Sequence, residues 1–545
     1  MNILGISRLH NGSVCLLQDG KVTYHIEEER LNHAKYEGTP FLGILKSREF
    51  IDTIDYVACC GFEPMKVPVE PSNFGDFSHS LYSLIVSRLF LKSKFYLEDY
   101  SDRHHLTHAA GAFYNSGFDN ALSLVFDGDG SPFEVWEDGK GHMKTEKFSA
   151  FECSYPNNFK EIKKEYFHQN EITKDNELSL GNYFATTALQ LGMKGGMRDA
   201  GKVMGLASYG KPSDIDVTSL FHFDPYADLR LKMREQNDLY NETKDMKNFQ
   251  KSADLSYAIQ DHTQKKMLKE IKECVEKTGI KNVCLSGGYV LNCVANYYVR
   301  KNLPDDINLY VEPISHDGGT AIGGAKLLWY EKTQSREKFE QKNIYYGFDY
   351  KTAKVLDDKM SPYPSVTPKD VATKIMNGNI VALYQGKSEQ GPRALGNRSI
   401  LFNPTYPDGK DIVNKVKGRE WYRPFAGTIL HEHANEWFDM AGLDESPFMM
   451  YAVDVLPNKQ HLIPAITHVD GTCRIQTLKR EQNEKYYDLI NEFYKLTGVP
   501  ILFNTSFNLA GKVMVETIQD ALETVNKSNI NYLYLPENEQ LYLTK

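Results

Sequence analysis

Two histidines four residues apart, His104 and His108, precede an apolar run that ends in Asp127. A second aspartate, Asp317, follows another apolar run and opens an Asp-Gly-Gly-Thr turn. On a helix, residues i and i+4 share one face, so both imidazoles can reach the same ion. Carboxylates at two strand ends complete a mixed nitrogen and oxygen set that suits a first-row divalent metal. The four residues therefore form a candidate metal site.

Ordinary structural roles explain the same residue types. Histidine pairs at this spacing are common on surfaces and in cores, and Asp-Gly is a frequent turn former. The context favours the metal, because both aspartates follow β-type runs and α/β proteins place ligands at the carboxyl ends of strands. His105 points about 100° away from His104 on a helix and is left out of the predicted set.

Four glycine-containing loops also follow predicted strands, at residues 5–13, 128–131, 286–289 and 317–320. A strand, a glycine-rich turn and a helix start aim backbone N–H groups at phosphate oxygens. The loops predict a cleft for a nucleotide or a nucleotide-like anhydride, lined by Gly128, Gly287, Gly288, Asn292 and Gly318. His10 lies in the first loop and is either an exposed turn histidine or a general base for a hydroxyl nucleophile.

The last third of the chain carries a second cluster of glycines and cations. Its segments are Gly-Pro-Arg-Ala-Leu-Gly, Lys-Gly-Arg-Glu-Trp-Tyr-Arg-Pro, Asp-Gly-Thr-Cys-Arg and Phe-Asn-Thr-Ser-Phe-Asn. Arginine forks bind phosphate bidentately and lysine adds a point charge, so these segments predict a polyphosphate site. Earlier, Lys202 and Lys211 lie in a glycine-rich stretch that suits either phosphate neutralisation or a solvated loop.

The composition is that of a large globular protein, with 545 residues, 41% hydrophobic and 25% charged. Two or three domains are expected at this length. A net charge of −9 argues against a large nucleic-acid interface. The eight cysteines form no CxxC pair and several lie in apolar runs, as is typical of buried, reduced thiols. No run suits a signal peptide or a membrane span, so a cytoplasmic enzyme is expected.

Strands and helices alternate along the chain, which predicts an α/β fold. Residues 2–28 suit a β-hairpin that leads into a helix. Further strands are expected at 56–60, 121–126, 283–286 and 307–311, with helices near 290–301 and 321–330. The polar run 331–342 is a surface linker or the solvated end of the preceding helix. A new pattern then begins with helix 368–377 and strand 380–384, so a domain boundary is expected near 345–360.

Along nearly its full length the chain resembles the O-carbamoyltransferases of the nodulation-factor, cephalosporin and tobramycin type. The matching segments are GIS-x-x-HNGS with EEER, HHLTHAAGAFYNSGF, FDGDG, GKVMGLASYG, LSGGYVLN, SHDGGTAIGGA, EQGPRALGNRSIL, REWYRPFA, HVDGTCRIQT and GVPILFNTSFN. The resemblance implies that residues 1–350 form a duplicated actin/ribonuclease-H-like (ASKHA) domain, like that of tRNA threonylcarbamoyl transferases. It implies a YrdC-like α/β domain for residues 351–545.

The resemblance also implies a two-step reaction. The YrdC-like domain makes carbamoyl adenylate from carbamoyl phosphate and ATP, with Mg²⁺ accompanying ATP, and the first domain passes the carbamoyl group to a hydroxyl and releases AMP. Iron(II), with zinc or manganese as alternatives, is implied at His104, His108, Asp127 and Asp317, and His10 is implied as the base. The carbamoyl-phosphate and ATP site maps onto Arg393, Lys417, Arg423, Arg474, Asn504 and Ser506.

Three other functions share parts of this pattern. A tRNA-modifying threonylcarbamoyl-adenylate enzyme has both folds, but the acidic net charge disfavours tRNA binding. A hydrogenase-maturation carbamoyltransferase would carry an acylphosphatase domain and paired-cysteine zinc fingers, which this sequence lacks. A non-catalytic relative of sugar kinases is disfavoured by the metal set and the cationic segments. The expected partner is a small hydroxyl acceptor, whether a sugar, a natural product or a nucleotide, and the protein is a monomer or a homodimer.

Overall fold

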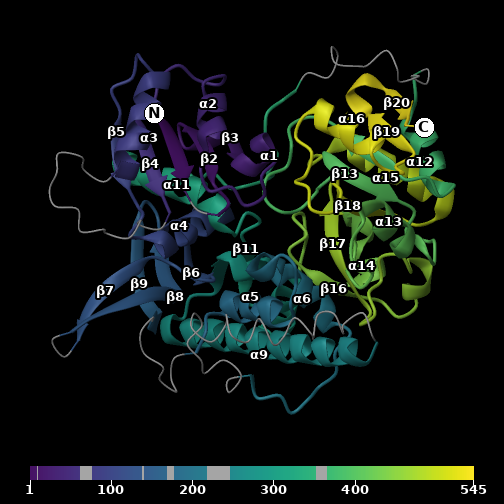
Figure 1. Cartoon of the computed structure of the whole chain (residues 1–545), viewed down its shortest axis with the longest axis horizontal. Helices are drawn as coiled ribbons and strands as arrows, with labels where there is room; N and C mark the ends of the chain where they lie inside the picture. Colours follow the sequence, from purple (N-terminus) through teal and green to yellow (C-terminus); the bar gives the residue numbers. More distant parts are fainter. Residues whose placement is uncertain are drawn as a thin grey trace.

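The computed structural model describes residues 1–8, 10–61, 77–137, 140–168, 177–217, 246–350 and 365–544. Three β-sheets organise these residues (Figure 1). Strands up to residue 311 form the first two sheets, and strands from residue 381 onward form the third. Helices pack against all three sheets, so the predicted α/β class is confirmed.

The first sheet has the strand order β3-β2-β1-β4-β5. Strand β2 pairs antiparallel with both β1 and β3, whereas β4 and β5 run parallel to β1. Their bounds are β1 Asn2–Ser7, β2 Ser13–Gln18, β3 Lys21–Glu27, β4 Tyr56–Cys60 and β5 Tyr96–Asp99. The predicted hairpin, the strand at 56–60 and the helix after the hairpin, α1 (Glu28–Asn32), are confirmed.

The second sheet repeats this arrangement. Strands β6, β8 and β9 are antiparallel neighbours, and β10 and β11 run parallel to β6. Strand β7 adds to β8. The bounds are β6 Asn120–Phe126, β7 Pro132–Glu137, β8 Lys140–Ser154, β9 Asn158–His168, β10 Asn282–Ser286 and β11 Asn308–Val311. Because strand order and direction match those of the first sheet, the predicted duplicated α/β unit is confirmed.

Helices α4 (His104–Ser116) and α11 (Thr320–Thr333) connect the two units (Figure 1). Helix α4 packs on β6, β8 and β10, and α11 packs on β1, β2 and β4. The two helices approach closely at Gly323, where an added Cβ would lie 1.9 Å from the backbone oxygen of Thr107. This contact brings the start of α4 beside the turn that precedes α11, and so joins the two halves of the predicted metal site.

Further helices surround the two units. Helix α9 runs beneath the second unit (Figure 1) and contacts α5, α6 and α10. The bounds are α2 Phe41–Ser47, α3 Phe77–Leu89, α5 Leu180–Gln190, α6 Ala200–Ala207, α9 Met246–Thr278 and α10 Cys293–Asn302. The helices expected near 290–301 and 321–330 are confirmed as α10 and α11. All eight cysteines are buried, as predicted. Within the described residues, no helix has both the length and the apolar character needed to cross a membrane.

The third sheet is mixed and has the order β15-β16-β17-β14-β18-β13-β12-β19-β20. Its strands are β12 Val381–Tyr384, β13 Arg398–Phe402, β14 Ala426–Leu430, β15 Phe438–Asp439, β16 Ala452–Val455, β17 Thr472–Leu478, β18 Ile501–Ser506, β19 Tyr532–Leu535 and β20 Gln540–Leu543. The main helices are α12 Pro368–Met376, α13 Gly409–Lys417, α15 Glu484–Thr497 and α16 Ile518–Asn526. The predicted helix 368–377 and strand 380–384 are confirmed as α12 and β12.

The polar run 331–342 was expected to be either a surface linker or the solvated end of the preceding helix, and each interpretation is correct for part of it. Thr333 is the last residue of helix α11, and the next residue, Gln334, caps the helix with a left-handed backbone conformation. The following residues up to 350 are not helical. The expected boundary near 345–360 lies largely in residues 351–364, outside the described part of the chain.

Direct polar contacts attach the third sheet to the second unit. The side chain of Asn296 on α10 donates a 2.9 Å hydrogen bond to the backbone oxygen of Met450. The neighbouring Tyr297 hydroxyl donates to the backbone oxygen of Asp439 at 2.7 Å. Leu395 and Ala426 join the apolar cluster that contains the buried residues of α4 and α11. The third sheet is therefore docked on the duplicated units.

Candidate metal centre and cation cluster

His104 and His108 lie on the first two turns of α4 and are buried. Their Nε2 atoms are 3.1 Å apart and their ring planes meet at 88°. This is the geometry expected from the i, i+4 spacing, because side chains one turn apart project from the same face. The pair therefore presents two nitrogen donors to one point.

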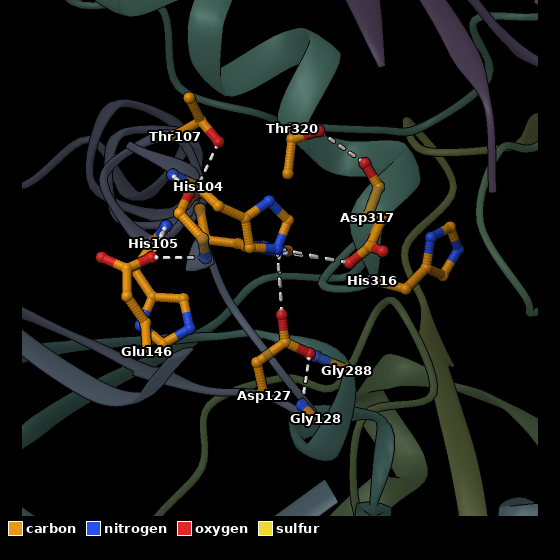
Figure 2. A network of polar contacts seen from close by, with 12 residues as sticks. His104, His105, Thr107, Asp127, Gly128, Glu146, Gly288, His316, Asp317 and Thr320 are labelled. Carbon is orange, nitrogen blue, oxygen red and sulfur yellow. Dashed lines mark hydrogen bonds and ion pairs between the residues drawn. The ribbon is translucent and has the colours of Figure 1, made fainter. Parts of the chain in front are cut away.

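Asp127 and Asp317 complete this group from two other elements (Figure 2). Asp127 Oδ2 lies 3.2 and 3.3 Å from the two Nε2 atoms, and Asp317 Oδ1 lies 3.6 and 3.5 Å from them. All four donor atoms lie within 4.8 Å of one another. Ligands of a tetrahedral ion with bonds of about 2.1 Å are separated by about 3.4 Å. The spacing therefore fits a first-row metal ion.

The charges in this cluster depend on one another. Burial alone would raise the pKa of Asp127, but hydrogen bonds with His104 and His108 hold that pKa well below its usual value. Burial also opposes protonation of His108, yet its hydrogen bonds to Asp127 and Asp317 raise the pKa to about 9. Metal-ligating imidazoles must be neutral, so metal binding at this cluster competes with protons and weakens as the pH falls.

Hydrogen bonds hold the carboxylate of Asp127 and the backbone of Asp317. Asp127 Oδ1 accepts the N–H groups of Gly128 at 2.8 Å and Gly288 at 2.9 Å, so Oδ2 faces the histidines (Figure 2). The backbone oxygen of Asp317 accepts hydrogen bonds from the hydroxyls of Ser7 at 3.0 Å and Thr320 at 2.7 Å. The partners of Asp127 fix the direction in which its Oδ2 presents a lone pair, and those of Asp317 fix the turn that carries its side chain.

His105 lies outside the cluster, as its helical position predicts. Its Nδ1 is 2.8 Å from Ser149 Oγ, and its backbone N–H donates to Glu146 Oε2 at 3.3 Å. Figure 2 shows His105 beside Glu146 and away from Asp317. The side chain thus helps to pack α4 against the second sheet.

His10 lies at the edge of the cluster. Its Nδ1 is 2.9 Å from Asp317 Oδ2, and its side chain is 64% exposed. The charge of Asp317 and the hydrogen bond to it raise the pKa of His10 to about 9. A protonated imidazole cannot accept a proton, whereas a cation bound by Asp317 would offset that carboxylate and favour the neutral ring. The position fits a base, and the role itself stays a prediction.

The predicted nucleotide-binding glycines surround the metal cluster, but their N–H groups have partners inside the protein. Those of Gly128 and Gly288 bind Asp127, that of Gly287 donates to Ser315 at 3.0 Å, and that of Gly318 donates to His316 Nδ1 at 3.0 Å. Asn292 caps α10 by accepting from the Ala295 N–H at 3.1 Å. Gly128 and Gly288 therefore hold a proposed metal ligand, and direct phosphate contact by any of the five residues stays a prediction.

Lys417 anchors the predicted polyphosphate site. It is the last residue of α13, it is buried, and its Nζ donates to the backbone oxygen of Ser506 at 2.5 Å and to Asn508 Oδ1 at 2.9 Å. Burial, followed by the charges of Arg419 and Arg423, lowers the pKa of Lys417 well below its usual value. These charges show that the lysine lies within a group of cations.

Sheet register brings together the other predicted residues of this site. Ala426 pairs with Arg474 on one side and with Asn504 on the other, so both side chains flank the start of β14. The Asn504 side chain donates to the backbone oxygen of Ala394 at 3.1 Å. Burial, followed by the charge of Arg474, lowers the pKa of the adjacent Arg393 to about 9. Residues from four separate motifs thus meet at one place.

Arg419 belongs to the same cluster, although it was absent from the predicted set. Burial, followed by the charges of Arg423 and Arg474, lowers the pKa of Arg419 well below its usual value. Within the described residues, the buried Nε atoms of Arg393, Arg419 and Arg474 have no hydrogen-bond partner. Like charges buried together with unpaired donor atoms are costly in a protein interior, so the cluster suits an anionic ligand. The run Lys-Gly-Arg-Glu-Trp-Tyr-Arg was the signal for Arg419.

Lys202 connects this cluster to the duplicated units. Its Nζ lies 2.7 Å from Glu420 Oε1 and 3.0 Å from Asp199 Oδ2. Glu420 Oε2 is 3.6 Å from Arg423. Lys202 is not a purely solvated side chain, because it forms ion pairs that link α6 to the loop after α13. Its contact with phosphate stays a prediction.

The fold and the two sites define an α/β protein in which a duplicated unit suits a metal ion and a docked third sheet suits an anion. The family model described as Carbamoyltransferase N-terminus matches residues 75–326, and the one described as Carbamoyltransferase C-terminus matches residues 372–541. Nodulation protein NolNO of Sinorhizobium fredii is 34% identical over 96% of this chain and 78% of its own. Nodulation protein NolO of Bradyrhizobium diazoefficiens is 32% identical over 79% of this chain and 77% of its own. The chain belongs to the carbamoyltransferase family and is an enzyme that transfers carbamoyl groups.

Solved structures show a weaker likeness. HypF of T. kodakarensis is 15% identical, with a TM-score of 0.35, over 61% of this chain and 48% of that one. The ROK hexokinase of Thermus thermophilus is 11% identical, with a TM-score of 0.29, over 62% of this chain and 100% of that one. Similarity at this level says nothing about the substrate.

Proposed function

We propose that the protein is an ATP-dependent O-carbamoyltransferase that works in two steps at two sites. The observation that carries this proposal is the presence in one chain of a buried cation cluster and a separate four-ligand cluster. The first suits two phosphate-bearing substrates, ATP and carbamoyl phosphate. The second suits an ion beside one phosphate and lies next to a histidine.

The first step activates the carbamoyl group. Carbamoyl phosphate, ATP and water yield carbamoyl adenylate, pyrophosphate and phosphate. Water first cleaves carbamoyl phosphate, which releases phosphate and leaves carbamate. A carbamate oxygen then attacks the α-phosphorus of ATP, and the bond to pyrophosphate breaks. Lys417, Arg419, Arg423 and Arg474 bind the phosphate oxygens, with Arg393 nearby, and Mg²⁺ accompanies ATP. The lowered pKa values of Lys417 and Arg419 support this assignment, because a bound anion would stabilise their charged forms.

The second step transfers the carbamoyl group. The hydroxyl oxygen of the acceptor attacks the carbamoyl carbon, the bond between that carbon and the AMP oxygen breaks, and the products are an O-carbamate and AMP. The hydroxyl proton passes to the free imidazole nitrogen of His10 while Asp317 holds the ring through Nδ1. Adenylation is needed because carbamate itself has a poor leaving group.

We further propose that His104, His108, Asp127 and Asp317 hold iron(II), with zinc or manganese as alternatives. A nitrogen and carboxylate set without thiolate suits all three ions, and only the family resemblance favours iron. The bound ion supplies positive charge beside the phosphate of the leaving AMP. The acceptor is a small molecule with a free hydroxyl, whether a sugar, a natural product or a nucleotide.

The proposal is tested by supplying the purified protein with ATP, carbamoyl phosphate and a panel of hydroxyl compounds. Pyrophosphate release should require both phosphate substrates, and mass spectrometry should detect one carbamoyl group on an acceptor together with AMP. Pyrophosphate release that does not depend on carbamoyl phosphate would refute the first step. Formation of ADP in place of AMP would refute the adenylate.

A further inference from the structure

Glu27 makes three polar contacts that link separate parts of the protein. It is the last residue of β3 and is buried. Its Oε2 accepts a hydrogen bond from Asn11 Nδ2 at 3.3 Å, and its Oε1 accepts the N–H of Gly391 at 3.1 Å. The same Oε1 lies 3.6 Å from His316 Nε2. One carboxylate thus contacts three loops.

Each of these loops carries a residue of a proposed site. Asn11 follows His10, and His316 precedes the metal ligand Asp317, beside which it lies in Figure 2. Gly391 begins the segment 391–396, which we call the arginine loop because it contains an arginine of the cation cluster. Glu27 therefore lies where the proposed base, the metal centre and the adenylate-forming site meet.

Other side chains hold the arginine loop firmly. Arg30 donates a hydrogen bond to the backbone oxygen of Gly391 at 2.9 Å. Together, Glu27 and Arg30 therefore bind the N–H and the oxygen of that glycine. From the other side, Glu389 Oε1 accepts the N–H groups of Leu395 at 2.6 Å and Arg398 at 3.2 Å. Two sets of hydrogen bonds therefore hold the arginine loop, one from Glu27 and Arg30 of the EEER segment and one from Glu389.

We propose that Glu27 is a positioning residue that keeps the His10 loop, the Asp317 loop and the arginine loop in fixed relation, so that carbamoyl adenylate is transferred before water destroys it. This inference rests on the proposed function. A mixed anhydride of carbamate hydrolyses readily, so the two sites must stay aligned and closed to water while the intermediate passes between them. Small misplacements of reacting groups are sufficient to slow transfer.

Glu28 provides a matched control. It is the next residue along the chain, it is also buried, and its carboxylate also accepts two hydrogen bonds, from the backbone N–H groups of Leu42 at 3.0 Å and Gly43 at 2.9 Å. Both partners belong to α2, beside the first sheet. Removing this carboxylate therefore perturbs the same junction between β3 and α1 without releasing the arginine loop.

The experiment measures carbamoylated acceptor formed per pyrophosphate released, in the full-length protein and in Glu27→Ala, Glu27→Gln and Glu28→Ala. We expect the ratio to fall about tenfold in Glu27→Ala, which corresponds to about 1.4 kcal/mol in the competition between transfer and hydrolysis. Glu27→Gln should restore most of it, because the amide oxygen can still accept the Gly391 N–H and the Asn11 amide can turn to present its oxygen. Glu28→Ala should keep the original ratio.

Hydrogen exchange of the arginine loop tests the positioning without relying on activity. Exchange at Gly391 should accelerate in Glu27→Ala and stay at the original rate in Glu28→Ala. The inference is overturned if Glu27→Ala keeps both the ratio and the exchange rate, if Glu27→Gln behaves like Glu27→Ala, or if Glu28→Ala uncouples equally. Failure of the wild-type protein to release pyrophosphate would overturn the proposed function instead, and the exchange result would still decide the positioning.

Discussion

Replacing Asp127 by asparagine is the most direct test of the metal centre. Asp127 Oδ1 accepts two backbone N–H groups, from Gly128 and Gly288, while Oδ2 faces the histidines. In Asp127→Asn the amide oxygen must keep the N–H groups, because an NH₂ group cannot accept them. The NH₂ group then takes the place of Oδ2 and offers no lone pair to a metal. The backbone therefore forces the amide into its non-ligating orientation.

The size of the effect follows from the loss of one charged ligand out of four. Changing a residue that only orients a ligand typically weakens metal binding about 10- to 100-fold. Loss of the ligand itself should reach at least the upper value, so we expect Kd to rise about 100-fold, or about 2.8 kcal/mol. Competition with a chelator of known affinity, followed by elemental analysis of the protein, measures this change.

Asp129 provides the control for this experiment. It lies in the same Asp-Gly-Asp-Gly turn and accepts a 3.0 Å hydrogen bond from Asn182, but it is not part of the four-ligand cluster. Asp129→Asn should bind metal as the wild type does. If Asp127→Asn retained one metal per chain at unchanged affinity, or if Asp129→Asn lost metal to the same extent, the assigned ligand set would be wrong.

Three further outcomes are expected. Arg419→Ala should lower the rate of pyrophosphate release about 100-fold, because losing one charge contact typically costs about 2–4 kcal/mol. Unchanged release would exclude Arg419 from the site. His10→Asn should keep pyrophosphate release but stop formation of carbamoylated acceptor; equal loss of both would indicate one composite site. Burial lowers the pKa of Lys326 from 10.5 to about 8, so the folded state binds this proton more weakly than the unfolded state. Stability should therefore rise by about 3 kcal/mol between pH 8 and 10.5, and denaturant titrations should show a smaller rise in Lys326→Met.

Local patterns were enough to predict most of the secondary structure. The hairpin of β1 to β3, the strand β4 and the helices α10, α11 and α12 appear where apolar periodicity and turn residues indicated them. The pairing of His104 with His108 was predictable for the same reason, because one helical turn separates them. These features depend on neighbours within a few residues, and such neighbours are visible in the sequence.

The four metal ligands were grouped by their chemistry and their places at strand ends, whereas the individual residues of the cation site were assigned by the family resemblance. How such distant residues meet is a matter of tertiary structure. Asp127 and Asp317 meet because the two duplicated units pack through α4 and α11 at a glycine contact. Arg474 and Asn504 meet because both pair with Ala426 across neighbouring strands. No spacing rule connects residues that are related only through sheet register.

The sequence by itself therefore determined the elements, the duplicated α/β pattern through its family resemblance, and the types of side chain available for chemistry. Only the tertiary structure decided how these groups are used. It directs the N–H groups of Gly128 and Gly288 to Asp127, it adds Arg419 to the cation cluster, and it places Glu27 between three loops. The physical reason is that hydrogen-bond partners and like-charge neighbours depend on distances across packed elements, which are set only when the sheets and helices dock.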